Sequence, residues 1–189
     1  MSTAWTAGTW LLAAVTLAAA QTPRAASGKF TLSSPDIAAG KTIAAAQVFN
    51  GFGCTGGNVS PALSWSNAPA GTKSFALLMH DPDAPTGSGW WHWVVYNIPA
   101  SATSLAAGAG DPKKGLLPAG AVQGRTDFGT AGYGGPCPPP GKPHRYYLRL
   151  YALKVEKLEV PADATAALIG FNVNAAALGK AELMGLYGR

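Results

Sequence analysis

Three apolar segments in the middle of the chain constrain its fold more than any other feature. Residues 75–79 (FALLM) are apolar throughout, residues 91–97 (WHWVVYN) are apolar at most positions, and residues 144–153 (HRYYLRLYAL) alternate arginine with aliphatic side chains. All three have the length of a strand, and a strand with two apolar faces lies inside a sheet that is covered on both sides. We therefore predict a central sheet that contains these segments.

Side chains alternate between the faces of a strand, so the pattern also predicts which residues lie together. In residues 91–97, one face is predicted to carry His92, Val94 and Tyr96, and the other Trp91, Trp93 and Val95. In residues 144–153, His144 and Tyr146 share a face with the aliphatic side chains at 148, 150 and 152. The arginines of that segment lie on the opposite, partly solvated face.

Composition favours a mainly β domain with many turns. The 189 residues include 24 glycines and 15 prolines, which suit short strands better than long helices. A hydrophobic content of 48% is ample for one core, and we assign residues 30–189 to a single domain. The net charge of +5 comes from scattered lysines and arginines, which argues against a nucleic-acid partner.

The remaining elements are predicted from shorter patterns. Strands are expected at residues 30–32 and 62–66 and, less clearly, at 41–49, while residues 50–61 and most of 99–143 are loop. Prolines around Cys137 (GYGGPCPPPGKP) predict a rigid wall because proline fixes φ. Short C-terminal helices are expected, one capped by Asp163 and running through residue 168, the other over residues 174–178 and 180–184.

The N-terminus and the cysteines bear on the compartment. Residues 10–20 (WLLAAVTLAAA) form a short apolar run that ends in small residues, as export signals do. We therefore expect a signal peptide at residues 1–20, a linker at 21–29 and a periplasmic or secreted protein. The two cysteines, Cys54 and Cys137, are consistent either with a disulfide or with two buried free thiols.

Acidic and imidazole groups are scarce, yet several lie at the ends of the three apolar segments. The chain has 9 Asp and Glu residues and 3 His. Asp81 and Asp83 follow the first segment, and His92 and His144 begin the other two, with Tyr146 on the face of His144. If these side chains lie together, they form a binding site that can hold an amine through its carboxylates and an anion through its imidazoles and hydroxyl. A zwitterionic head group suits both halves.

The sequence gives weaker support for other functions of these residues. Two histidines and a carboxylate resemble a metal triad, but no close ligand spacing such as H-E-x-x-H is present. Acid–base catalysis is open to the same groups, but G-x-S-x-G is absent and neither cysteine has a His neighbour in sequence. The alternative is a purely structural role, in which the aspartates cap turns and the histidines are core residues. We expect a binding protein without a metal, a cofactor or enzymatic activity. His80 is assigned a strand-end role on the opposite face.

Taken together, these motifs resemble the phosphatidylethanolamine-binding protein family, in particular its bacterial branch labelled Raf-kinase-inhibitor-like. The matching segments are NVSPALSW at residues 58–65, DPDAP at 81–85, GWWHWVVYNIP at 89–99, GYGGPCPP at 132–139, PHRY at 143–146 and AELMGLYGR at 181–189. The resemblance covers residues 30–189. It implies antiparallel β-sheets, one large and central and one smaller, with C-terminal helices. Phe171 and Asn172 depart from the Gly-His that the family often carries there.

The resemblance also implies a small anion-binding pocket at one end of the sheets. The residues that it assigns to ligand binding are Asp81, Asp83, Trp91, His92, Gly135, Pro136, His144 and Tyr146. It implies a Cys54–Cys137 disulfide that joins the glycine-rich loop to the proline wall. The expected function is non-enzymatic binding of a phosphate-containing or zwitterionic small ligand, such as a lipid head group. The alternatives are an inhibitor of a protein target that acts through the pocket rim and, less favoured, a metal-assisted hydrolase. Peripheral membrane contact and a homodimer are left open.

Overall fold

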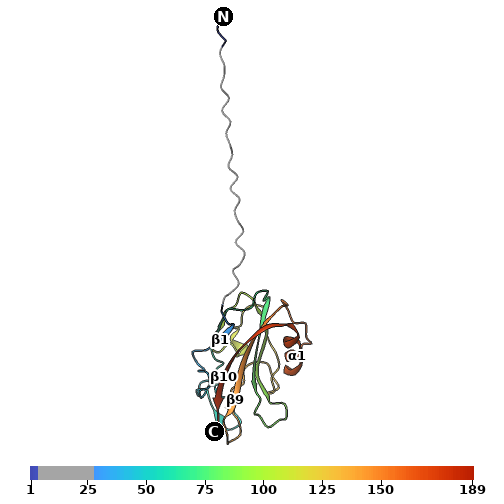
Figure 1. Ribbon diagram of the computed structural model, residues 1–189. Helices are drawn as coiled ribbons and strands as arrows, with labels where there is room; N and C mark the ends of the chain where they lie inside the picture. Colours follow the sequence, from blue (N-terminus) through green and yellow to red (C-terminus); the bar gives the residue numbers. More distant parts are fainter. Residues whose placement is uncertain (4–27) are drawn as a thin grey trace.

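The computed structural model describes residues 1–3 and 28–189 (Figure 1). Most of the predicted signal peptide (residues 4–20) and most of the predicted linker (residues 21–27) therefore lie outside the described residues. Among the described residues, no helix is both long enough and apolar enough to cross a membrane.

A five-stranded antiparallel sheet forms the centre of the domain, in the order β10-β9-β5-β6-β8. Figure 1 shows its neighbouring strands β9 and β10 side by side. Its strands are β5 (Ser74–Asp81), β6 (Trp90–Pro99), β8 (Val122–Gln123), β9 (His144–Leu153) and β10 (Ala177–Tyr187). The smaller elements are β1 (Thr31–Ser33), β4 (Leu63–Ser66) and β7 (Ser104–Leu105) in a three-stranded sheet, the hairpin β2 (Asn50–Gly51) and β3 (Cys54–Thr55), the 3₁₀ turn η1 (Pro112–Lys114) and the helix α1 (Ala166–Ala176). The predicted antiparallel β fold, with one large and one smaller sheet, is confirmed.

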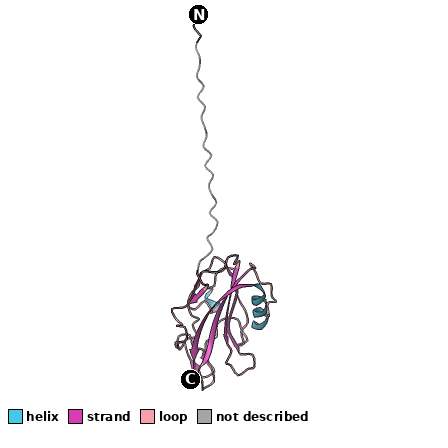
Figure 2. Ribbon diagram, in the orientation of Figure 1, coloured by secondary structure: helices cyan, strands magenta, loops and turns pink. Residues whose placement is uncertain are grey.

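Both faces of the central sheet are covered, as its apolar strands predict. Leu77 and Met79 of β5 pack in a core with the three-stranded sheet, whereas Ala76 and Leu78 pack in a second core against α1. Figure 2 shows α1 and the small β1 strand on opposite sides of the long strands. Alternate side chains of β5 thus pack into two different cores, which explains why the strand is apolar at nearly every position.

The C-terminal prediction is wrong in its second half. One helix, α1, is capped by Thr165 instead of Asp163, because the Thr165 hydroxyl accepts a hydrogen bond from the Leu168 N–H. Residues 177–187 form strand β10, paired with β9 along its whole length from Leu153 to His144. Good helix formers such as Ala, Glu, Leu and Met misled the prediction, since long-range pairing overrides local propensity. The weak strand expected at residues 41–49 is reduced to one bridge, from Thr42 to Leu186.

Candidate functional site

A cavity of about 340 Å³ opens where β5 ends and β6 and β9 begin. These ends meet because antiparallel neighbours run in opposite directions. The polar lining residues that lie on the central strands are here called the polar cluster: Asp81, His92, His144 and Tyr146. Most other lining side chains are apolar: Phe52, Ala84, Pro85, Trp90, Phe128, Pro138, Pro139 and Pro140. Few polar groups within apolar walls are typical of a small-molecule site.

A β-bulge in β6 brings His92 to this cavity. Met79 pairs with Trp93 and His80 pairs with Trp91, so His92 is an extra residue opposite neighbouring positions of β5. The bulge interrupts the alternation, and the His92 ring lies 5.2 Å from the ring of Tyr146, centroid to centroid. The predicted grouping of His92 with Val94 and Tyr96 is therefore wrong. Trp91 instead packs with Val94 and Tyr96 in the core beside α1.

Asp81 and His144 form the central pair of the polar cluster. His144 Nδ1 lies 2.7 Å from Asp81 Oδ2, and the Asp83 backbone N–H donates to Asp81 Oδ1 over 2.8 Å. The Asp81 residue is only 2% exposed. Asp81 therefore accepts hydrogen bonds through both oxygens, and its bond to Nδ1 leaves the other nitrogen of His144, Nε2, for the cavity.

Asp83 has a different role from its neighbour. It is absent from the cavity lining and forms an ion pair with Arg145, whose Nη2 lies 2.6 Å from Asp83 Oδ1. The Arg145 guanidinium and backbone N–H groups hold the pKa of Asp83 at about 2. Asp83 thus fixes the start of β9 relative to the end of β5, and with it the position of His144.

Two polar atoms of the cluster are buried without a protein partner. His92 Nε2 and the Tyr146 hydroxyl make no hydrogen bond to any described residue. Burial raises the pKa of Tyr146 far above its usual range, and both the charge of Asp81 and the closeness of its carboxylate to the hydroxyl raise it further, so the phenol stays protonated. Unpartnered buried polar atoms are uncommon and call for a specific explanation.

Burial lowers the pKa of His92 to about 4, although its hydrogen bond to Gly134 and the charge of Asp81 act in the opposite direction. We therefore expect stability to fall as the pH is lowered from about 6.5 toward 4. In that window the unfolded chain binds a proton at His92 and the folded chain does not, so protonation favours unfolding. The loss should reach about 3 kcal/mol at the acid end.

Urea unfolding at pH 7 and at pH 4.5 measures this acid loss, and the variant His92→Asn is the control. The variant should show a flatter dependence in this range, since asparagine does not titrate. Asp83 titrates at lower pH and does not obscure the comparison. A wild-type dependence that the variant reproduces would contradict this account of His92.

Three other predicted site residues lie outside the cavity lining. Trp91 packs against His80, with ring centroids 4.2 Å apart and ring planes tilted by 36°, on the opposite face of the sheet. Its neighbour Trp90 lines the cavity instead. Gly135 and Pro136 support the wall from behind, because Gly135 N–H donates to Asn58 and Pro136 accepts from the Phe49 N–H.

Sequence reasoning did not identify several lining residues. Phe128 lies in the long loop that showed no periodicity, and Phe52 lies in the glycine-rich loop. Trp91 was the predicted site residue, whereas the bulge in β6 places Trp90 at the cavity. The proline wall was predicted, and Pro138, Pro139 and Pro140 line the cavity.

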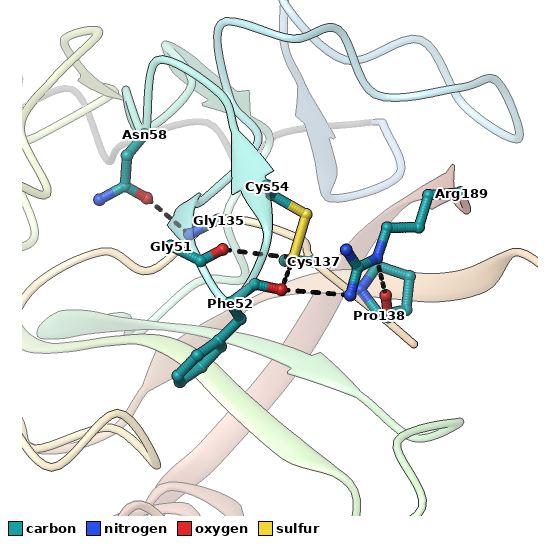
Figure 3. Close-up of a disulfide and its surroundings, with 8 residues drawn as sticks. All are labelled: Gly51, Phe52, Cys54, Asn58, Gly135, Cys137, Pro138 and Arg189. Atoms are coloured by element: carbon teal, nitrogen blue, oxygen red, sulfur yellow. Dashed lines mark hydrogen bonds between the residues drawn. A yellow bond between two sulfur atoms is a disulfide. The ribbon is translucent and has the colours of Figure 1, made fainter. Parts of the chain in front are cut away.

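Cys54 and Cys137 form a disulfide beside the cavity, the pairing that the resemblance implies (Figure 3). Arg189 reinforces the same junction. Its Nε donates to the Pro138 carbonyl over 2.7 Å, and its Nη2 donates to the Phe52 carbonyl over 3.2 Å. Both Cys137 and Arg189 line the cavity. The disulfide and the two hydrogen bonds of Arg189 thus hold the glycine-rich segment (residues 50–61) against the proline wall.

The described residues offer no suitable set of donors for a metal ion. Within residues 1–3 and 28–189, no group of three or more His, Cys, Asp or Glu side chains is arranged to hold a metal ion.

Comparisons with known proteins agree with this architecture. A family model described as phosphatidylethanolamine-binding protein matches residues 33–188. YbcL of Escherichia coli strain K12 is 53% identical over 159 residues, which cover 84% of this chain and 87% of YbcL. YbhB of the same strain is 47% identical over 158 residues, covering 82% of this chain and 98% of YbhB.

Two further comparisons extend the likeness. The crystal structure of E. coli YbcL, described as a new member of the mammalian PEBP family, matches with a TM-score of 0.83 at 52% identity. That match covers 86% of this chain and 99% of the YbcL chain. LppC of Mycobacterium tuberculosis, named as a lipoprotein, is 38% identical over 169 residues, covering 89% of this chain and 77% of LppC.

Proposed function

The chain belongs to the phosphatidylethanolamine-binding protein family, and on that premise we propose that its cavity binds a small phosphate-bearing ligand or lipid head group. One observation carries the proposal. The Asp81–His144 pair lies beside two buried polar atoms, His92 Nε2 and the Tyr146 hydroxyl, that no described residue satisfies. Burying a polar group without a partner costs free energy, and a polar ligand in the cavity would recover it.

The chemistry of the lining defines the ligand further. The Tyr146 hydroxyl is a donor for an anionic oxygen, and the Arg189 guanidinium contributes a fixed positive charge at the same cavity. Phe52, Phe128 and Trp90 offer aromatic surface to an organic substituent. A compact anionic head group that carries a short apolar part therefore suits both parts of the lining.

We further propose that the site binds its ligand without chemical conversion. A hydrolase that forms a covalent intermediate needs an activated side-chain nucleophile in contact with the ligand. The Cys137 sulfur is engaged in the disulfide, and the Thr86 hydroxyl donates to the Gly89 carbonyl. The polar cluster then acts by hydrogen bonding and orientation.

An oxidising compartment is part of the proposal. Disulfides persist in exported proteins and are rare in the reducing cytosol. The Cys54–Cys137 bond and the lipoprotein name of the relative LppC support export of this chain.

Replacing Tyr146 by phenylalanine tests the proposed site. The change removes only the unpartnered hydroxyl, so phosphoethanolamine should bind about tenfold more weakly while stability stays equal or rises slightly. Isothermal titration calorimetry and urea unfolding measure the two effects.

Tyr133→Phe is the matched control for this experiment. Tyr133 is also a buried tyrosine, but its hydroxyl donates to the Gln47 carbonyl over 2.8 Å. Its loss should lower stability by about 1–2 kcal/mol and leave binding nearly unchanged. If Tyr146→Phe is destabilising and binds normally, the hydroxyl is structural and the proposal fails.

A further inference from the structure

The hydrogen bonds around His92 determine which of its ring nitrogens carries a proton. Nδ1 lies 2.7 Å from the Gly134 carbonyl oxygen, and the Gly134 N–H donates to the His92 carbonyl over 2.9 Å. A carbonyl oxygen only accepts, so Nδ1 must be the protonated nitrogen and the donor. These two bonds hold the ring between β6 and the Gly134 loop, and they leave the Nε2 lone pair free.

The surroundings of Nε2 keep the ring neutral. His92 is 3% exposed, and burial disfavours its charged form. Charged or titratable groups face it from the neighbouring elements: Asp81 on β5, His144 and Tyr146 on β9, and Arg189 after β10. His80 lies on the other face of the sheet and acts on the pKa of His92 only through its charge. The negative charge of Asp81 would favour a second proton on the His92 ring. However, both oxygens of that carboxylate already accept hydrogen bonds, from His144 Nδ1 and from the Asp83 N–H.

A neutral imidazole with Nδ1 protonated can only accept at Nε2. A fully deprotonated anion also presents only acceptors, so it would place an acceptor against an acceptor at this buried position. We infer that His92 selects a ligand that brings its own proton, namely a phosphate monoester or inorganic phosphate bound through a P–OH group. The ligand O–H donates to His92 Nε2, and its unprotonated oxygens accept from donors such as the Tyr146 hydroxyl.

The inference rests on the proposed function and narrows it to one ligand class. A phosphate monoester monoanion has an O–H to donate. A sulfate monoester has nearly the same shape and charge but has no such proton, and an ionised phosphodiester, the linkage of an intact phospholipid, also lacks one. The cavity should therefore prefer monoesters to both analogues. A buried site built to pair with a ligand hydroxyl rejects analogues that lack it.

Methyl phosphate, methyl sulfate and dimethyl phosphate form the test set, because none carries an amine. At pH 5 methyl phosphate is mostly the monoanion, since its second pKa is about 6, and it then has the same charge as the other two. The pKa of His92 is about 4, so the ring stays largely neutral. Titration of the whole protein should show methyl phosphate binding at least tenfold more tightly than methyl sulfate and dimethyl phosphate.

His92→Asn is the informative variant. Its side-chain amide can still donate to the Gly134 carbonyl, but it places no acceptor at the position of Nε2. The preference for methyl phosphate over methyl sulfate should fall to within about threefold. A second measurement does not depend on the variant folding: the ¹⁵N resonance of His92 Nε2 in the wild-type protein should shift with methyl phosphate and not with methyl sulfate.

Each outcome of this experiment is decisive. Equal binding of methyl phosphate and methyl sulfate by the wild-type protein would overturn the inference while leaving an anion site in place. A preference that survives in a folded His92→Asn variant would also overturn it. Tight binding of dimethyl phosphate would point to intact lipid head groups instead. If none of the three anions binds at millimolar concentration, the proposed function fails as well.

Discussion

Replacing Gly135 by alanine should lower the free energy of unfolding by more than about 3 kcal/mol, and the variant is expected to fold poorly. A Cβ at this position would lie 2.1 Å from the Gln47 carbonyl oxygen and 2.6 Å from the Phe49 nitrogen. Both atoms belong to the backbone, so no rotamer change relieves the clash. Separating the two segments would also break the Gly135–Asn58 hydrogen bond and the Phe49–Pro136 hydrogen bond.

Gly170→Ala is the matched control for this substitution. Gly170 is also buried, but it lies within α1, and the nearest atoms to an added Cβ are 3.9 Å away. Alanine there should stabilise the protein by about 0.5–1 kcal/mol because glycine is a poor helix former. Urea unfolding of both variants tests the pair. Similar changes in the two, or a Gly135→Ala variant as stable as wild type, would show that the 47–49 segment moves aside easily.

Gly135 also shows what a sequence pattern can and cannot reveal about the site. The motif GYGGPCPP singled out this segment, but it predicted a lining residue where the structure has a supporting one. The glycine is required by a close approach of backbone to backbone, between segments far apart in the chain. Which segments meet is decided by tertiary packing, and periodicity carries no information on it.

The central strands were predictable because each segment carries apolar side chains on both faces, which indicates a strand that is buried on both sides. Strand β5 alternates between two covered faces, and β9 places His144 and Tyr146 on the predicted face. The bulge at His92 was not predictable, since nothing in WWHWVVYN distinguishes an extra residue from a regular one. It changes the site by exchanging Trp91 for Trp90 at the cavity. Strand β10 was missed because its pairing with β9 outweighs a helix-forming composition.

Removing the Cys54–Cys137 disulfide should have the second large effect. The cysteines are 83 residues apart in sequence, and cross-linking a loop of that length restricts the unfolded chain. The chain-entropy relation gives a stabilisation of about 4.5 kcal/mol at 25 °C. The double variant Cys54→Ser/Cys137→Ser should therefore unfold at clearly lower urea concentration than the wild-type protein, without a change in the fold of the central sheet.

The double serine variant should lose much of its unfolding free energy but little of its affinity for the ligand. The polar cluster comes from β5, β6 and β9, whereas the disulfide joins the β2–β3 hairpin to the proline wall, and Arg189 still bonds the Phe52 and Pro138 carbonyls. A loss of less than tenfold in methyl phosphate affinity is expected for the folded variant. Dithiothreitol should destabilise the wild-type protein by a similar amount and leave the variant unaffected. An unchanged unfolding midpoint in the variant would mean that hydrogen bonds, those of Arg189 and those of Gly135 and Pro136, are enough to hold the proline wall against the glycine-rich loop.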